Sequence, residues 1–175
     1  MARFNLNDYE TVEERIKRFY AAHEGGRITT EWENNFESGV PRTWVVKASI
    51  YLTDGDQANN LPKATGYAVE VDGTGGANNG SALENAETSA IGRALANMNL
   101  SGNKRASREE MQKVQAISER DWVGDATKMG DVTSLRWLYS QAKAAGVSAD
   151  LLERIEQHGK KLSADGEGQG AVGGV

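Results

Sequence analysis

The chain has 175 residues, of which 38% are hydrophobic and 26% are charged, a composition typical of one globular domain with an appendage. It contains no cysteine, which excludes disulfides, thiolate metal sites and cysteine nucleophiles. The formal net charge is −5, and the balance is negative in the first 113 residues as well as in the remainder, so a site for a polyanion has to be a local basic patch.

The first part of the chain predicts a helix followed by three strands. Apolar residues recur at helical spacing over residues 8–23, and Thr11 and Glu14 have the spacing of a capping box. The next three segments alternate apolar and polar residues and are rich in β-branched and aromatic side chains, which predicts an antiparallel meander. Residues 54–63 are expected to form a turn or a longer loop. The three strands are expected over residues 27–36, 43–52 and 64–72.

The stretch SALENAETSAIGRALANMNL, residues 81–100, predicts a helix that is unusually rich in small side chains. A Gly-rich loop precedes it, and Ser81 with Glu84 matches a capping box. Gly92 lowers helix propensity by about 1 kcal/mol relative to alanine, which close packing against a sheet or another helix would offset. The expected apolar stripe consists of Leu83, Ala86, Ala90, Ile91, Ala94, Leu95 and Met98.

Further helices are expected in the last third of the chain. Ser107 and Glu110 have capping-box spacing and start a helix that runs to about residue 119. The sequence therefore predicts an α+β fold: a three-stranded antiparallel meander packed on helices, with core order α-β-β-β-α-α, and a C-terminal helical hairpin. The expected domains are a core over 1–120, a linker over 121–130, the hairpin over 131–162 and a disordered Gly-rich tail over 163–175.

Basic residues supply the first candidate site. A groove between the meander and the helix of residues 81–100 would collect several of them, and single-strand binding needs such cations beside flat side chains. Tyr51 and Tyr67 are the candidate flat surfaces, whereas Trp32 and Trp44 are expected in the core. Ordinary surface charge is the competing interpretation, and Arg93 would then pair with Glu84 or Glu87. The candidate cations are Lys47, Arg93, Lys104, Arg105, Arg42 and Lys63.

Two enzymatic interpretations were weighed against this one. The Gly-rich loop before a capped helix has the outline of a phosphate cradle, but it lacks both the Walker pattern and G-x-G-x-x-G. An acidic set could be imagined as a metal-nuclease cluster, but turn aspartates have backbone reasons to occur, and Glu70 and Asp72 are expected on opposite faces of a strand. That set is Asp54, Asp56, Glu70 and Asp72.

The segment ENAETSAIGRALANMNL resembles a signature of phage single-strand annealing and single-stranded-DNA-binding recombination proteins, the Sak/Erf-type relatives of the eukaryotic annealing mediators. The strand ATGYAVEV before it, and the β-β-β-α order, are similar to that family too. The resemblance covers roughly residues 8–118, and Arg93 is the candidate residue that falls within the signature. It implies ATP-independent, non-enzymatic binding and annealing of single-stranded DNA in phage recombination or replication, without a cofactor, by a ring or filament of identical subunits.

The expected partners follow from this interpretation. They are single-stranded DNA, further copies of the chain, and host or phage replication and recombination proteins that dock on the C-terminal hairpin. No apolar run approaches the length that crosses a membrane, and the first residues lack the core of a signal peptide, so we expect a cytoplasmic protein without a membrane partner. The alternatives are a non-catalytic protein-interaction module and a small metal-dependent nuclease.

Overall fold

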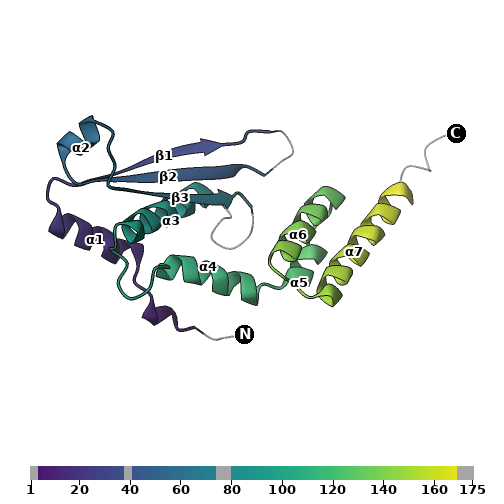
Figure 1. The fold of residues 1–175 in the computed structure, drawn as a ribbon. Helices are drawn as coiled ribbons and strands as arrows, with labels where there is room; N and C mark the ends of the chain where they lie inside the picture. Colours follow the sequence, from purple (N-terminus) through teal and green to yellow (C-terminus); the bar gives the residue numbers. More distant parts are fainter. Residues whose placement is uncertain (1–3, 38–40, 74–79, 169–175) are drawn as a thin grey trace. The chain divides into compact units, whose positions relative to one another are not determined.

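The computed structural model describes residues 4–37, 41–73 and 80–168 of the chain, which divides into two compact units (Figure 1). Unit 1 is Met1–Ala116 and unit 2 is Ile117–Val175. The expected α+β class is confirmed, because a three-stranded antiparallel sheet of order β1-β2-β3 packs on helix α3. The elements of unit 1 are η1 Leu6–Asp8, α1 Val12–Ala22, β1 Arg27–Asn34, β2 Thr43–Tyr51, α2 Asp54–Ala58, β3 Ala64–Val71 and α3 Ala82–Asn97. Helix α4, Arg108–Glu119, begins in unit 1 and ends just past its boundary.

The predicted loop over residues 54–63 contains a short helix, α2, so that prediction was incomplete. Thr53 and Asp56 form a capping box that starts it: the Asp56 backbone N–H donates to Thr53 Oγ1 over 3.1 Å, and the Thr53 backbone N–H donates to Asp56 Oδ2 over 3.1 Å. Five residues are too few to show a helical period, and therefore only the cap could have signalled this helix.

Two of the three expected capping boxes are confirmed. Thr11 with Glu14 starts α1, and Ser107 with Glu110 starts α4. The third prediction was wrong, because Ser81 makes no side-chain hydrogen bond at the start of α3. Its backbone, with φ −132° and ψ 28°, departs from the extended conformation in which an N-cap side chain reaches back to the helix.

Small side chains let α3 lie directly on the sheet. Four fully or nearly buried residues of the sheet, Val46, Ala48, Ile50 and Ala68, meet Phe19 of α1 and the alanine face of α3. Gly66 marks the closest approach: a Cβ atom there would lie 2.4 Å from both Ala90 O and Ala94 N. The small-residue pattern of α3 is thus explained by close packing on β3 within unit 1. The buried residues of that α3 face are Ala86, Ala90, Ala94 and Leu95.

Gly92, the other glycine of this interface, faces α1. A Cβ atom on it would lie 2.7 Å from Val12 Cγ2. The backbone of α3 is therefore approached from two sides, by β3 at the alanines and by the start of α1 at Gly92. This close packing explains why glycine occupies position 92, although glycine lowers helix propensity.

Unit 2 is a three-helix arrangement of α5 Trp122–Thr127, α6 Val132–Ala144 and α7 Ala149–Gly168. The expected linker over 121–130 is corrected here, because α5 supplies Trp122 and Ala126 to the core of this unit. Two helices alone bury little apolar surface, and α5 adds the third side. The expected tail begins at 163, but α7 continues to Gly168, and the remaining residues 169–175 lie outside the described part. The other core residues are Leu135, Leu138, Ala142 and Ile155.

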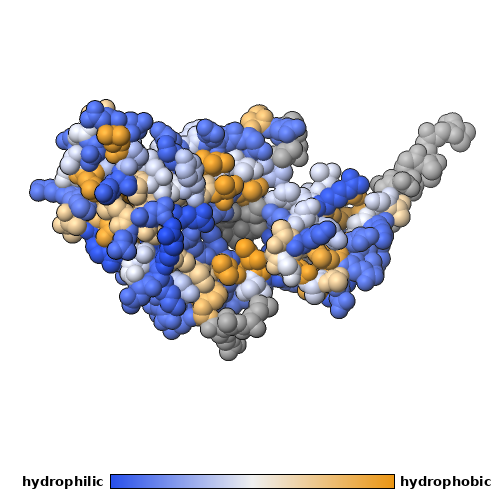
Figure 2. Space-filling model, viewed as in Figure 1, coloured by the Kyte–Doolittle hydropathy of each residue, from blue (hydrophilic) through white to orange (hydrophobic). Residues whose placement is uncertain are grey.

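Within the described ranges, no helix is both long and apolar enough to cross a membrane. The surface seen in Figure 2 is mainly hydrophilic, with hydrophobic residues in separate patches.

Candidate nucleic-acid interface

The strand register assigns each side chain of the sheet to one of two faces. Trp44, Val46, Ala48 and Ile50 of β2 face α3, as the alternation predicts. Lys47 lies on the opposite face, paired with Glu31 of β1 on one side and Tyr67 of β3 on the other. Helix α3 therefore covers one face of the sheet only.

The open face, defined by Val45, Lys47, Tyr67 and Val69, carries exposed apolar and aromatic side chains around one cation. Tyr67 is 56% exposed and Val69 is 57% exposed. Lys47 Nζ lies 3.4 Å from Glu31 Oε2, and exposed pairs of this kind contribute about 0–1 kcal/mol, so the ammonium can exchange that carboxylate for another anion at little cost. The open face thus combines a cation with a flat ring, as single-strand binding requires.

Arg93 has structural partners. Its Nε lies 2.8 Å from Glu110 Oε1 of α4, and its Nη1 donates to the backbone carbonyl of Tyr67 over 2.9 Å. The expected alternative partner Glu87 instead accepts a hydrogen bond from Thr30 Oγ1 over 2.6 Å. Arg93 consequently joins α3 to the edge of β3 and to the start of α4, while its side chain stays 52% exposed.

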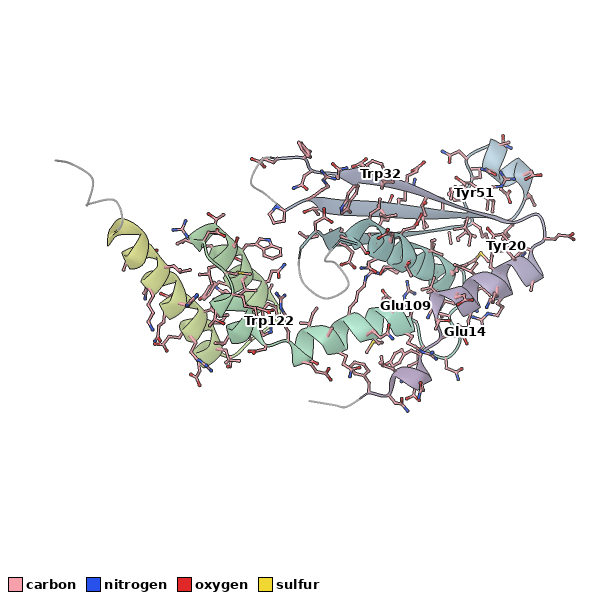
Figure 3. All side chains as sticks on the ribbon, turned by 180° about the vertical axis from the view of Figure 1, so that it is seen from behind. Glu14, Tyr20, Trp32, Tyr51, Glu109 and Trp122 are labelled. Atoms are coloured by element: carbon pink, nitrogen blue, oxygen red, sulfur yellow. The ribbon has the colours of Figure 1, made fainter. Side chains whose placement is uncertain are left out.

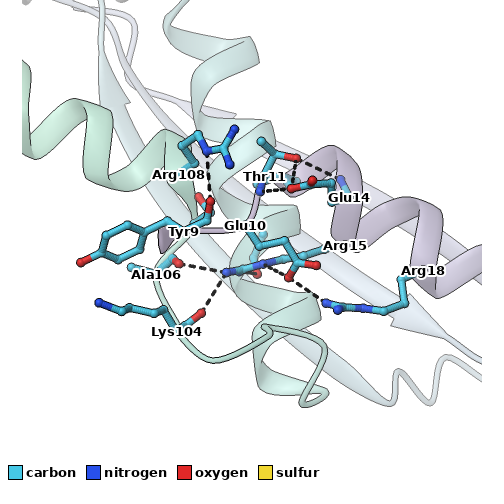
Figure 4. A network of polar contacts seen from close by, with 12 residues as sticks. Tyr9, Glu10, Thr11, Glu14, Arg15, Arg18, Lys104, Ala106 and Arg108 are labelled. Carbon is cyan, nitrogen blue, oxygen red and sulfur yellow. Dashed lines mark hydrogen bonds and ion pairs between the residues drawn. The ribbon is translucent and has the colours of Figure 1, made fainter. Parts of the chain in front are cut away.

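The pair Lys104 and Arg105 lies in the loop after α3. Arg105 donates to Asn97 Oδ1, and Asn97 Nδ2 in turn donates to the carbonyl of Thr65 over 2.6 Å. Lys104 Nζ lies 4.8 Å from the centre of the Tyr9 ring, which is a cation–π distance. This loop also surrounds a buried arginine, Arg15, which no sequence pattern marks as a site residue (Figure 4).

Three other candidates lie at the two ends of the sheet. Lys63 is at one end, where its backbone N–H donates to Ile50 O over 2.7 Å. Tyr51 is near the same end, but it is only 6% exposed and its hydroxyl donates to Asn60 Oδ1 over 3.0 Å, which leaves no free ring face for a base. Arg42 precedes β2 at the other end.

The eight predicted residues therefore do not line one groove between the sheet and α3. That interface is filled by the close-packed core, and Lys47 lies on the face of the sheet that α3 does not cover. The cations instead occupy the open face, the edge of β3, the loop after α3 and the two sheet ends. The groove prediction was wrong because it placed Lys47 and the helix on the same face.

The acidic set considered for a nuclease is dispersed. Asp54 and Asp56 belong to the first turn of α2. Glu70 pairs with Lys113 of α4, and Asp72 accepts a hydrogen bond from Trp44 Nε1 over 3.1 Å. The expectation that Glu70 and Asp72 lie on opposite faces was wrong, because residues two apart in a strand share a face and both of these lie beside Trp44. Among the described residues, no group of three or more His, Asp or Glu side chains is placed to hold a metal ion. Most of the Gly-rich loop considered as a phosphate cradle lies outside the described part, at residues 74–79.

Trp32 and Trp44 are both expected in the core from the strand alternation, and for Trp32 this prediction was wrong. Trp32 on β1 is 56% exposed (Figure 3), whereas Trp44 is partly buried against the core. Phe36, just after β1, is 83% exposed. Trp32 has the alternation expected of a core position, but it lies on the edge strand, where neighbours are present on one side only.

The first turn of α1 holds a carboxylate with a shifted pKa, Glu14. The pKa of Glu14 lies below its ordinary value because the carboxylate accepts hydrogen bonds from the backbone N–H and the hydroxyl of Thr11, with Arg108 lowering it further. A carboxylate whose pKa is lowered in the folded state stabilises that state above its unfolded pKa, and this contribution is lost as the pH falls through the folded pKa.

We expect Thr11→Val to raise the pKa of Glu14, because it removes the donated hydroxyl bond while keeping the backbone N–H. Nuclear magnetic resonance titration of the Glu14 carboxyl measures this pKa directly. Asp131 is the internal control, since its pKa is lowered by Ser134 in unit 2 and should not move. An unchanged pKa of Glu14 would show that the hydroxyl does not contribute.

Comparison with known proteins gives one match. Residues 16–98, a little under half of the chain, match the family model described as Slr1353 N-terminal dsRNA-binding domain-like. The matched segment runs from within α1 through the three strands to just after α3, which is the α-β-β-β-α part of unit 1. No curated protein and no solved structure matches the chain, so the resemblance to phage annealing proteins stays a prediction. Residues 16–98 are similar to this dsRNA-binding domain-like family.

Proposed function

We propose that the protein binds nucleic acid through unit 1, and that its preferred ligand is a single strand. The likeness of residues 16–98 to a dsRNA-binding domain-like family supports the general class of ligand. The observation that carries the preference for a single strand is the open face of the sheet, where Lys47 lies opposite the exposed ring of Tyr67. We propose further that an oligomer of the protein anneals complementary single strands of DNA, without ATP and without enzymatic activity.

Physical differences between the ligands favour a single strand over a duplex. Proteins recognise double-stranded RNA mostly by its shape and by contacts to phosphates and 2′-hydroxyls, and they recognise single strands by stacking splayed bases on aromatic rings. A face that offers Tyr67, Val45 and Val69 around one lysine has few cations for phosphates but has flat and apolar surface for bases. The net charge of −5 points the same way, since strong duplex binding needs many neutralised phosphates.

Fluorescence-anisotropy titrations with labelled single-stranded DNA, duplex DNA and duplex RNA test this proposal. We expect the single strand to bind most tightly of the three ligands. The change Lys47→Gln should weaken binding of the single strand about two- to fivefold. It should also reduce the slope of log affinity against log salt concentration by about 0.7, which corresponds to the loss of one phosphate contact. The matched control is Lys17→Gln, which removes the same charge from an exposed ion pair on α1 and should leave binding unchanged.

Three outcomes would count against the proposal. Absence of binding to every oligonucleotide would reject nucleic-acid binding, and tighter binding to duplex RNA would reject the preference for single strands. Equal losses from Lys47→Gln and Lys17→Gln would remove the open face from the site. Annealing is tested separately, by mixing complementary labelled strands without ATP and comparing the pairing rate with and without protein.

A second function is favoured by a specific feature of unit 2. A groove of about 720 Å³ lies between α6 and α7, with Leu135, Tyr139 and Ile155 among its lining residues. This groove is where a protein partner would dock if unit 2 is an interaction module. Mass measurements with and without a single-stranded oligonucleotide separate self-assembly on DNA from assembly that is independent of it.

A further inference from the structure

A cluster of three aromatic rings and one arginine lies at the end of the sheet where β1 ends and β2 begins. The Trp32 and Trp44 rings meet edge to face, with centroids 5.3 Å apart. The Arg42 guanidinium carbon lies 5.2 Å from the centre of the Phe36 ring and 5.3 Å from the centre of the Trp44 ring. We call these four residues the aromatic–arginine cluster.

The cluster is organised but not buried. Phe36 and Trp32 are mostly exposed, so their rings are not explained by core packing. Trp44 is held in place by its Nε1 hydrogen bond to Asp72, which also occupies that carboxylate. Within the described part of the chain, Arg42 makes no ion pair and contacts the two rings instead.

The charges around the cluster leave Arg42 able to meet an anion. Glu33 is close in sequence, but it pairs with Val45 and therefore lies on the open face of the sheet, opposite the face of Trp32 and Trp44. Asp72 keeps its negative charge when its Oδ1 accepts the hydrogen bond from the neutral Trp44 Nε1–H, but among the described residues no ion pair joins it to Arg42. A guanidinium on an aromatic ring can contact a phosphate through its edge while its flat face remains stacked.

We infer that the aromatic–arginine cluster is a base-stacking site for single-stranded nucleic acid, an inference that rests on the proposed function. Exposed rings fit the flat faces of unpaired bases, and a guanidinium plane fits both bases and phosphates. A base pair inside a duplex hides those faces, so this site discriminates against duplex ligands. The site is distinct from the Lys47–Tyr67 pair, because Trp32 and Trp44 lie on the α3-bearing face of the sheet.

Stacking rather than charge would dominate the affinity at this cluster, since it contributes one cation. Removing one stacking ring is therefore expected to weaken binding about 5- to 100-fold, the range given by alanine substitution at base-stacking positions. The same substitution should hardly alter the salt dependence, because no phosphate contact is lost.

The test uses the full chain and three substitutions of Phe36, which is too exposed to be needed for folding. Phe36→Ala removes the ring, Phe36→Leu keeps apolar bulk without a flat face, and Phe36→Tyr keeps the ring. Each protein is titrated with an oligothymidylate and with the same backbone lacking bases. We expect Phe36→Ala and Phe36→Leu to weaken only the oligothymidylate complex, and Phe36→Tyr to bind like the wild type.

The possible results are distinguishable. If the wild type binds oligothymidylate and Phe36→Ala binds it equally well, the stacking site is wrong while the proposed function stands. Equal loss for both ligands would show that Phe36 does not contact bases, and this also overturns the inference. If the wild type binds neither ligand, the proposed function and the stacking site fail together.

Discussion

Replacing Arg15 with alanine should lower the free energy of unfolding of unit 1 by about 3–5 kcal/mol, because the change removes a fully buried side chain that donates hydrogen bonds to three backbone carbonyls. The Arg15 side chain is fully buried, and its Nε lies 3.5 Å from Glu10 Oε2. Removing Arg15 leaves the negative charge of Glu10 with one ion-pair partner among the described residues, Arg18, instead of two. It also removes a donor from three backbone carbonyls, and the two in the loop after α3, those of Lys104 and Ala106, have no intrahelical N–H to replace it.

Those carbonyls explain why the effect should be large. Arg15 Nη1 donates to Gly92 O over 3.0 Å, and Nη2 donates to Lys104 O and Ala106 O over 3.2 and 2.9 Å (Figure 4). One side chain of α1 thus ties together the middle of α3 and the loop that follows it. Glu109 of α4, labelled in Figure 3, adds a contact at the same junction, because its Oε1 accepts a hydrogen bond from the backbone N–H of Val12 over 3.2 Å.

Arg18→Ala is the matched control for this prediction. Arg18 Nη2 lies 2.7 Å from the same carboxylate oxygen of Glu10, but its side chain is 43% exposed, so its loss should cost about 0–1 kcal/mol. Arg15→Lys should fall between the two, because an ammonium keeps the charge but lacks the planar fork that reaches separate carbonyls. Urea denaturation followed through amide signals of unit 1 gives the comparison. Equal effects of Arg15→Ala and Arg18→Ala would contradict it.

The sequence predicted the class and order of unit 1 because its signals are local. Strand alternation placed Trp44, Val46, Ala48 and Ile50 on one face, and the register confirms it. Capping boxes at Thr11 and Ser107 predicted where two helices begin. A pattern within one element was enough for these predictions.

The site was harder to predict because it depends on which elements meet. The alternation of β2 puts Lys47 on the face opposite Val46 and Ala48. It does not show which of the two faces of the meander α3 covers. Arg93 was judged by helical neighbours such as Glu87, whereas its partners come from β3 and α4. No local sequence pattern shows that α1 buries Arg15 against the loop at 104–106.

The exposed aromatics illustrate the same limit. Trp32 alternates like a core residue, and only its position on an edge strand leaves it uncovered. A large apolar side chain is expected inside by default, so sequence reasoning favours burial until neighbours are known. The aromatic–arginine cluster becomes visible only when Phe36 and Arg42, which follow β1 and precede β2 in the sequence, are placed together.

Replacing Gly66 with alanine should destabilise unit 1 by about 1–3 kcal/mol, although alanine is ordinarily the better residue inside a strand. The added Cβ would lie 2.4 Å from Ala90 O and Ala94 N and 3.0 Å from Arg93 C. All three are backbone atoms of α3, which cannot move aside as a side chain can. The helix has to shift away from β3, and the alanine contacts of the core loosen with it.

Two opposing terms decide the sign of this change. Gly→Ala at a compatible site stabilises a protein by about 0.4–1 kcal/mol, because the unfolded chain loses freedom. Overpacking against fixed backbone costs more than that, so destabilisation should win. Gly25→Ala isolates the favourable term, since nothing lies within 4 Å of a Cβ there. Urea denaturation should show loss of stability for Gly66→Ala and little change for Gly25→Ala. If both variants behave alike, the close approach of α3 to β3 is not what requires glycine at position 66.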